Sequence, residues 1–565
     1  MNRSMRRAVC LLLAVGLCLP LMPRSRAADQ FSDVPQSSYA YQDILSLRQM
    51  GIVTGIGGGQ YGLGMTFRRC DLVLMLARLL GWQTASSSSG FADVPQSHYA
   101  ASAIAAAVEH GVVDAGGNFR PGDAITRREL AVMLSRACSA QGVNLARQAA
   151  GQSASSPFTD VPKSDADFGA IRMAYDFGII NGMSSQLPTQ FQPAGVATRE
   201  QAAAMMMRFY RRTQGRLGDF HAFYAISSWQ QRGLMASMDT VSAGWARMEY
   251  SGGSALLNTT SAGGNSWAVP SGSEQVFALA RQNGSPLLLG VYMDTSATVS
   301  GGTQPQATAL LTSESARAQA VAALAAAVGE KGFDGVTIDF EGFVSEGYRA
   351  PFTAFLQQLR NALPAGKLLY CAVPPKDYYR GYDYRAIGEV CDKVILMAHD
   401  YEITTMPDSM KNTQLPETPI ASIGDVYRSL EQITDTQTGV RDRSKILLAL
   451  SFGTARWEIV NGRVSHDAVK QSDYASIASR LAKGDSKPYY NEEYQSPYLS
   501  YYDASDGTTN VVWYENSRSI KAKCELARLF GLGGVSFWRL GTIPDMQGFD
   551  LDVASSLSSL RGNIN

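Results

Sequence analysis

The chain has 565 residues, which is enough for roughly two to five domains. Its hydrophobic fraction of 45% is ordinary for a globular protein, and its 50 basic residues balance its 50 acidic ones. This balance gives no sign of the basic face typical of nucleic-acid-binding domains, so we expect no nucleic-acid partner.

The first 27 residues have the three parts of a secretory signal peptide. Arginines among the first seven residues form a basic start, residues 8–22 are almost entirely apolar, and residues 25–27 supply a small-residue cleavage site. The apolar run is too short for a stable membrane span, although an uncleaved N-terminal anchor is the alternative. We therefore predict a signal peptide at 1–27, a secreted protein and no stable membrane span after cleavage.

The cysteines do not indicate a disulfide framework or a metal centre. Of the seven cysteines, Cys10 and Cys18 lie within the predicted signal peptide, which leaves an odd number. The remaining cysteines have no CxxC or similar spacing, and the five histidines are dispersed. We expect no bound metal and no cofactor.

A short motif opens three similar segments of the N-terminal part. Phe-x-Asp-Val-Pro begins at Phe31, Phe91 and Phe158, and each time a helical apolar pattern, a glycine turn and a second helix follow. The second helix opens with Thr126-Arg-Arg-Glu in the second segment and with Thr198-Arg-Glu in the third. A threonine there can cap the free N–H groups of the helix, with an acidic residue soon after.

Each second helix carries an arginine in its first turn, at Arg69, Arg127 and Arg199. A cation at this end of a helix is unfavourable beside the helix dipole, but it is tolerable where it meets an external anion. Ordinary solvated surface arginines are the alternative. Three equivalent occurrences favour a role in anion binding.

Residues 31–212 resemble three S-layer homology (SLH) domains, which have this FxDVP opening and a TRxE segment. The resemblance implies small all-α repeats packed as a pseudo-trimer that binds acidic secondary cell-wall polysaccharide at the bacterial surface. It also implies polymer contacts at Arg127 and Arg199, with Arg69 at the equivalent position of the first repeat. Binding by that repeat stays open, because Arg68 replaces its threonine. The predicted repeats span 28–84, 88–147 and 157–212.

From residue 219 to residue 560, apolar strand-like runs alternate with helical patterns, which is typical of βαβ units. Eight such units favour an α/β TIM barrel, a fold that typically takes about 250 residues and tolerates insertions. The Tyr-, Asp- and Ser-rich stretch 458–515 predicts an α+β insertion between strands seven and eight. The predicted strands are Phe220–Ser227, Val241–Trp245, Pro286–Met293, Gly335–Phe340, Leu368–Val373, Lys393–Ala398, Lys445–Ser451 and Gly534–Trp538.

The fourth predicted strand ends in two carboxylates. Because side chains alternate along a strand, Thr337, Asp339 and Glu341 should all point into the barrel mouth, where TIM barrels carry their chemistry. Repulsion between the two carboxylates should raise one pKa and keep one acid protonated near neutral pH. This arrangement suits general-acid cleavage of a glycosidic bond, and a salt-bridged pair without chemistry is the alternative.

The stretch that ends at Glu341 resembles the DxxDxDxE signature of glycoside hydrolase family 18, the chitinase-like family. Residues 219–560 look most like its branch of spore-cortex and peptidoglycan N-acetylglucosaminidases. The resemblance implies that Glu341 is the acid/base and that Asp339 orients the substrate's N-acetyl group, which acts as the nucleophile. The further substrate contacts that it implies are Asp334, Thr337, His399, Asp400, Glu515 and Trp538.

Two departures from the family pattern keep alternative functions open. Thr337 stands where many members have Asp, and His399 stands where they have Tyr. The first hypothesis is a wall-anchored glycosidase that cleaves β-1,4-linked N-acetylglucosamine in peptidoglycan or its fragments, or in chitin. The others are a catalytically weak or inactive carbohydrate-binding surface protein and a structural S-layer component. The retained Glu341 and Asp339 favour the enzyme.

Overall fold

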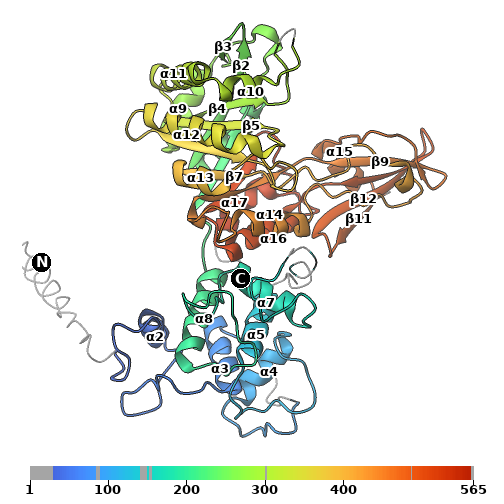
Figure 1. Cartoon of the computed structure of the whole chain (residues 1–565). Coiled ribbons are helices and arrows are strands. Elements are labelled where there is room, and N and C mark those ends of the chain that lie inside the picture. The colour runs from blue at the N-terminus through green and yellow to red at the C-terminus, as the bar shows by residue number, and fades with distance from the viewer. Residues whose placement is uncertain are drawn as a thin grey trace, which may run out of the picture. The chain divides into compact units, whose positions relative to one another are not determined.

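The computed structural model describes residues 30–83, 90–139, 149, 151, 155–299, 302–484 and 486–561 (Figure 1). The predicted signal peptide at 1–27 lies outside these residues. The chain divides into two compact units, of which the first combines the chain up to residue 137 with residues 192–210. The second unit combines residues 138–191 with the chain from residue 211 onward. The third predicted repeat therefore contributes to both units.

The second helices of repeats two and three begin where the threonine caps predict. Thr126 and Glu129 form a reciprocal cap at the start of α5, because the Glu129 N–H donates to Thr126 Oγ1 at 3.2 Å and the Thr126 N–H donates to Glu129 Oε2 at 2.9 Å. At α8 the Thr198 N–H donates to Gln201 Oε1 at 3.2 Å. The helices are α2 (Tyr41–Gln49), α3 (Arg69–Leu80), α4 (Ala101–Glu109), α5 (Arg127–Ser139), α7 (Phe168–Asp176) and α8 (Arg199–Thr213).

The aspartate of the Phe-x-Asp-Val-Pro motif has the same local role each time. It accepts backbone hydrogen bonds from the loop that precedes the second helix, while the motif's phenylalanine packs on an aromatic ring of that loop. The backbone donors are Tyr61, Gly62 and Leu63 to Asp33, Phe119 and Arg120 to Asp93, and Phe191 to Asp160. The ring pairs are Phe31–Tyr61 at 5.4 Å, Phe91–Phe119 at 5.5 Å and Phe158–Phe191 at 5.2 Å. The sequence repeat is therefore also a structural repeat.

The C-terminal part is a closed eight-stranded parallel barrel, which confirms the predicted TIM fold. The strand order is β1-β14-β8-β7-β6-β5-β4-β2, and β2 pairs with β1 to close it. All eight predicted strands are present, and the second is longer than predicted and pairs with a short extra strand, β3 (Ser254–Asn258). The barrel strands are β1 (Asp219–Tyr224), β2 (Thr240–Ser251), β4 (Leu287–Asp294), β5 (Gly335–Glu341), β6 (Leu368–Val373), β7 (Lys393–Leu396), β8 (Ile446–Ser451) and β14 (Gly534–Trp538).

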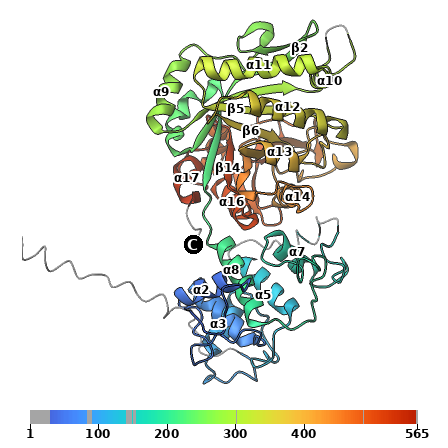
Figure 2. The same cartoon turned by 60° about the vertical axis from the view of Figure 1, so that its left-hand side comes forward.

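Helices surround the barrel, as Figure 2 shows. Their apolar faces cover the outward-facing side chains of the strands, which are buried on both sides, as is usual for parallel sheets. These helices are α9 (Ser273–Asn283), α10 (Gln306–Thr312), α11 (Glu314–Lys331), α12 (Arg349–Ala362), α13 (Tyr384–Val390), α14 (Ile423–Ile433), α16 (Ser517–Phe530) and α17 (Val553–Arg561).

The barrel interior contains a polar chain as well as an apolar cluster. The two ring nitrogens of the fully buried His221 lie 2.7 Å from the hydroxyls of Ser536 and Ser242, and Ser242 Oγ lies 2.6 Å from Thr337 Oγ1. Burial lowers the pKa of His221 to about 3, so the imidazole is neutral near pH 7. These polar groups therefore satisfy one another's hydrogen-bonding capacity without placing a charge in the core.

The predicted α+β insertion lies between β8 and β14 (Figure 1). It is an antiparallel sheet in the order β10-β9-β13-β12-β11, with one helix packed on it through Ile477 and Leu481. Its elements are β9 (Ala455–Val460), β10 (Arg463–Val464), α15 (Tyr474–Ala482), β11 (Ser486–Asn491), β12 (Ser496–Asp503) and β13 (Thr508–Trp513).

Among the described residues, no helix is long and apolar enough to cross a membrane. In the same part of the chain, no group of three or more His, Cys, Asp or Glu side chains could hold a metal ion. Cys70, Cys138, Cys371, Cys391 and Cys524 are free and buried.

Candidate active site

The carboxyl end of β5 carries two carboxylates on one face. Asp339 and Glu341 lie two residues apart, so strand alternation turns both side chains to the same side as Thr337. Asp339 is 1% exposed, whereas Glu341, the last residue of the strand, is half-buried. The neighbouring strand β4 places Tyr292 opposite Asp339 and Asp294 opposite Glu341. The end of β5 therefore presents one buried and one accessible acid.

Burial and mutual repulsion oppose full ionisation of this pair. Burial raises the pKa of Asp339 well above its usual 3.8, and the charge of Glu341 raises it further. Burial also raises the pKa of Glu341, an effect that the charge of His399 opposes. Hydrogen bonding between the two carboxyl groups further raises the pKa of Asp339 and opposes the rise in the pKa of Glu341. The pair therefore retains a proton at a higher pH than two separate exposed carboxyls would.

His399 and Asp400 follow β7 and form a second polar pair. His399 Nδ1 lies 2.9 Å from Asp400 Oδ2, and Ser451 Oγ donates to Asp400 Oδ1 at 3.2 Å. Burial would raise the pKa of Asp400, but the charge and the hydrogen bond of His399 lower it below its usual 3.8. His399 Nε2 is buried, and the described residues offer it no hydrogen-bond partner. Asp400 is therefore ionised close to a pair that holds a proton.

Trp538 lies across the barrel mouth from the β5 carboxylates. In the closed strand order, β14 is four strands from β5 in either direction, so the two strands are diametrically opposed. Trp538 ends β14, is half-buried, and packs edge-to-face on Phe223 with ring centroids 4.9 Å apart. An aromatic ring thus lies opposite Glu341, on the far side of the space that a sugar would occupy.

The structure does not place two of the predicted substrate contacts, on and before β5, at the open barrel mouth. Asp334 precedes the strand, and its Oδ2 accepts a hydrogen bond from the Leu287 N–H at 2.9 Å, where β4 begins. At about 3.3 Å per residue, Asp334 lies about 23 Å from Glu341, at the opposite end of the barrel. Thr337 is fully buried and bonded to Ser242, so it has no surface for a substrate. Both residues stabilise the barrel.

The structure places Glu515, another predicted substrate contact, inside the fold. It is 1% exposed, and the Lys523 ammonium of α16 lies 2.8 Å from its Oε2. Ser519 Oγ donates to the same carboxylate at 2.5 Å. Glu515 therefore has its partners inside the fold and has no accessible surface for a sugar.

Removing one partner of this buried ion pair should destabilise the protein strongly. Lys523→Met leaves the Glu515 carboxylate buried and unpaired, so we expect a loss of about 3–5 kcal/mol of unfolding free energy. The midpoint of urea denaturation, followed by tryptophan fluorescence, measures the change. The double variant Lys523→Met with Glu515→Leu removes both charges and should recover most of the loss. A single variant within 1 kcal/mol of wild type would show that the pair contributes little.

The prediction missed several residues near the carboxylates. The predicted third strand stopped at Met293, one residue short of Asp294, so its pairing with Glu341 was not foreseen. Tyr292 stacks on Trp267 at 4.9 Å, and burial together with the charge of Glu341 raises its pKa to about 12. Aligning the third predicted strand with the fourth, which is β5, could have identified Tyr292 and Asp294.

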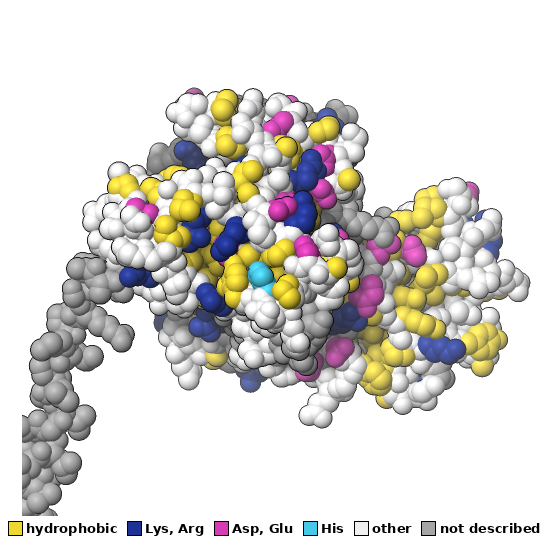
Figure 3. Space-filling model, turned by 90° about the horizontal axis from the view of Figure 1, so that it is seen from below, with side chains coloured by type: hydrophobic (Ala, Val, Ile, Leu, Met, Phe, Trp, Pro, Cys, Tyr) yellow, Lys and Arg dark blue, Asp and Glu magenta, His cyan; other side chains and the backbone are white. Residues whose placement is uncertain are grey.

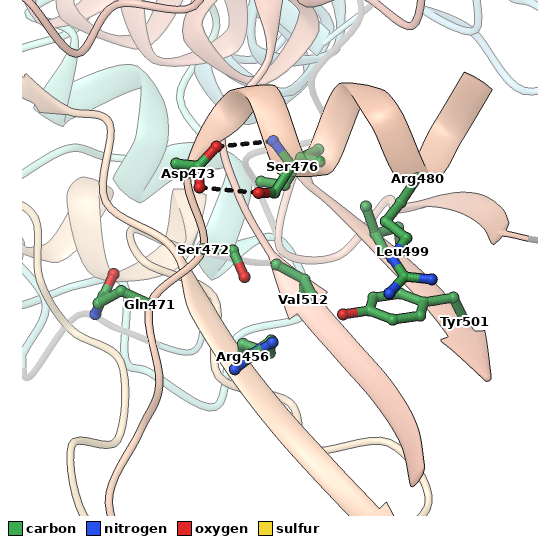
Figure 4. A pocket seen from close by; sticks show the side chains of 10 residues that line it. Arg456, Gln471, Ser472, Asp473, Ser476, Arg480, Leu499, Tyr501 and Val512 are labelled. Atoms are coloured by element: carbon green, nitrogen blue, oxygen red, sulfur yellow. Dashed lines mark hydrogen bonds between the residues drawn. The ribbon is translucent and has the colours of Figure 1, made fainter. Parts of the chain in front are cut away.

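A separate cavity of about 260 Å³ lies in the insertion, between α15 and its sheet (Figure 4). Arg456 and Arg480 line it together with Asp473, but each arginine already pairs with an acid, Glu458 at 3.4 Å and Asp503 at 2.8 Å. None of the predicted site residues lines this cavity.

Two of the arginines predicted to bind wall polymer, Arg69 and Arg199, contact a neighbouring repeat. Arg69 Nε donates to the Phe119 carbonyl at 2.9 Å and Arg69 Nη1 pairs with Glu129 at 2.8 Å, while Arg199 Nε donates to the Tyr61 carbonyl at 2.8 Å. Arg127 is 3% exposed and Arg199 is half-buried. Of the three, Arg199 has the most surface available to an external ligand. Other Lys and Arg side chains are exposed around apolar patches on the face in Figure 3.

The geometry defines a class of protein. It is a TIM barrel whose mouth combines two neighbouring carboxyl groups with raised pKa values and an opposed aromatic ring, an arrangement suited to acid-catalysed cleavage of a glycosidic bond. Residues 293–542 match the family model of glycosyl hydrolases family 18, and residues 90–131 and 157–203 match the S-layer homology domain. Two separate parts of the chain thus match two different family models.

Curated relatives match part of the chain. It is 34% identical over 219 residues to a Bacillus subtilis (strain 168) protein provisionally named sporulation-specific glycosylase YdhD, covering 38% of this chain and 48% of the relative. It is 26% identical over 239 residues to the cortical fragment-lytic enzyme of Bacillus anthracis, covering 41% of this chain and 51% of that protein. The chain spans about half the length of these relatives.

Solved structures of similar proteins include the Bacillus cereus spore cortex-lytic enzyme SleL. It has a TM-score of 0.49 and 18% identity, covering 61% of this chain and 74% of that one. A chitinase from Chromobacterium violaceum ATCC 12472 has a TM-score of 0.47 and 23% identity, covering 61% of this chain and 98% of that one.

Proposed function

We propose that the protein is a cell-wall-anchored glycoside hydrolase that cleaves β-1,4-linked N-acetylglucosamine-containing glycans. The observation that carries this proposal is the acid pair Asp339 and Glu341 at the end of β5, within a domain that matches glycosyl hydrolases family 18. The names of the relatives favour peptidoglycan or its fragments over chitin.

The proposed mechanism assigns one role to each group at the mouth. Glu341, half-buried and with a raised pKa, donates its proton to the leaving glycosidic oxygen. The substrate's own acetamide oxygen attacks the anomeric carbon, and Asp339 stabilises the acetamide N–H as positive charge develops. Asp400 and His399 bind the 2-substituent of the same sugar, and Trp538 stacks on its ring. Glu341 then takes a proton from the water that hydrolyses the intermediate, so the anomeric configuration is retained.

The anchor would consist of three SLH repeats that bind acidic secondary cell-wall polysaccharide. The repeated hydrogen bonds of Asp33, Asp93 and Asp160 support a count of three. Arg199 is the arginine best exposed to contact the polymer, and Arg69 and Arg127 would act mainly by holding the repeats in register. The protein would then be secreted and held at the bacterial surface.

Replacing Arg199 should weaken attachment to the wall. In the full mature chain, Arg199→Ala removes one charged contact to the polymer, so we expect at least about tenfold weaker cosedimentation with purified cell walls. The double variant with Arg127→Ala should lose more, and raised salt should weaken the wild type. Arg136→Ala, on α5 and paired with Asp114, is the matched control and should bind as wild type. If the double variant still binds cell walls and salt does not weaken the binding, the proposal that the SLH repeats bind an acidic wall polymer is contradicted.

The departure at His399 favours a second candidate function, a surface lectin that binds glycan without turnover. Measuring release of reducing ends from peptidoglycan fragments and from chitin oligosaccharides separates the two functions. The enzyme releases reducing ends from at least one substrate, whereas a lectin binds both without product. A purely structural S-layer component neither binds nor cleaves them.

A further inference from the structure

Arg539 is a half-buried cation that no carboxylate of the described chain neutralises. It directly follows Trp538, and its Nη1 donates to Ser227 Oγ at 2.6 Å. Among the residues that the structure describes, no Asp or Glu oxygen lies within 4.0 Å of this guanidinium. A half-buried charge without a counter-ion costs free energy, so an anion from outside the protein would be favoured there.

The position of Arg539 is fixed by two loops at the carboxyl ends of the barrel strands. Ser227 belongs to η2 (Ile226–Ser237), which follows β1, and Arg539 begins the loop that follows β14. Gln231 of η2 accepts a hydrogen bond from the Gly541 N–H at 2.7 Å and donates to the Ile543 carbonyl at 2.6 Å. The guanidinium is therefore held beside the proposed sugar-stacking ring.

Charge is divided across the barrel mouth. Asp294 and Glu341 end β4 and β5, and Asp400 follows β7, two strands from β14. Arg539 follows β14, which is four strands from β5 and three from β4 in the closed barrel. A substrate that develops positive charge at the cleaved sugar and carries an anion on the next sugar would match this division. The planar guanidinium is suited to bidentate binding of a carboxylate. Chitin is neutral, whereas N-acetylmuramic acid has a lactyl carboxyl group.

We propose that Arg539 recognises the free lactyl carboxylate of an N-acetylmuramic acid adjoining the N-acetylglucosamine whose bond is cleaved. This inference rests on the proposed function and narrows its substrate class to peptidoglycan glycan without peptides. In intact peptidoglycan the peptide occupies that carboxyl as an amide. An amidase, which adds water across this amide and releases the peptide, must therefore act first.

The wild-type protein tests the proposal directly through its substrates. Three oligosaccharides of equal length are compared: alternating N-acetylglucosamine and N-acetylmuramic acid with free carboxyls, its methyl ester, and chitin oligosaccharide. We expect kcat/KM for the free acid to be at least about tenfold higher than for the ester, as for a lost charged hydrogen bond. Equal values for acid and ester overturn the proposal. Absence of turnover of all three overturns the proposed function as well.

A variant tests the residue. Arg539→Gln should reduce the acid-over-ester preference to about one, and Arg539→Lys should restore part of it. Arg232→Gln is the matched control, because Arg232 lies in η2, the segment that also holds Ser227, but is exposed and stacks on Trp229 at 4.4 Å. It should keep the wild-type preference. An undiminished preference in folded Arg539→Gln would overturn the assignment, and the ester comparison decides the proposal if this variant does not fold.

Discussion

Glu341→Gln is expected to lower kcat by about 10²–10⁴-fold, the usual contribution of general acid–base catalysis. The amide keeps the shape of the side chain but has no proton to transfer to the leaving oxygen. Because Glu341 is the half-buried last residue of β5 and faces the mouth, the fold should survive. Single-turnover hydrolysis of a peptidoglycan fragment, with circular dichroism as a check of folding, measures both effects.

Glu346→Gln provides the matched control for that variant. Glu346 lies in the loop that follows β5 and has a side-chain exposure of 63%, so its substitution should leave turnover unchanged. In the wild type, kcat/KM should fall as pH rises through the raised pKa of Glu341, because the acid must be protonated to act. In Glu341→Gln, this fall in kcat/KM at high pH should be absent. Wild-type turnover in Glu341→Gln would show that another residue is the general acid.

Asp339→Asn is expected to lower kcat by about 10²–10³-fold with a much smaller change in KM. The buried Asp339 would stabilise charge that develops on the acetamide N–H only in the transition state, where a preorganised charge contributes most. Asp339 is poorly placed to act as a nucleophile, because it lies on the same strand and the same face as Glu341. Steady-state kinetics on N-acetylated fragments separate kcat from KM.

The same mechanism restricts which substrates can react. Fragments with a de-N-acetylated sugar at the cleavage point should not be hydrolysed, and a thiazoline mimic of the cyclic intermediate should inhibit competitively. Asp339→Asn should weaken binding of this mimic more than binding of substrate. Trapping a covalent sugar–protein adduct would refute the substrate-assisted route.

The barrel was predictable because its signals are local. Each strand is a short apolar run bounded by turn residues, and the alternation along β5 placed Asp339 and Glu341 on one face without knowledge of the fold. The threonine cap at Thr126 is equally local, since its partner Glu129 is three residues away. Most of the fold could therefore be predicted from sequence features that lie within a single strand or helix.

The contacts of Asp334, Thr337 and Glu515 could not be predicted from the sequence alone. Asp334 belongs to the family signature, but only the strand boundary at Gly335 shows that it lies at the wrong end of the barrel. Glu515, just before α16, forms an ion pair with Lys523 within that helix. Thr337 is hydrogen-bonded to Ser242, which is far away in the sequence. Arg539 was passed over because a missing counter-ion is a property of packing, which the sequence does not display.

The five cysteines of the described chain, free and buried, bear on how such a protein can be exported. Burial raises the pKa of Cys138, Cys371 and Cys524, so these thiols resist both deprotonation and oxidation in the folded state. The described fold contains no disulfide, so a protein secreted as proposed would need no disulfide-forming catalyst to assemble outside the cell. During the proposed export, its thiols would be exposed to oxidants only while the chain is unfolded, so rapid folding after translocation would protect them.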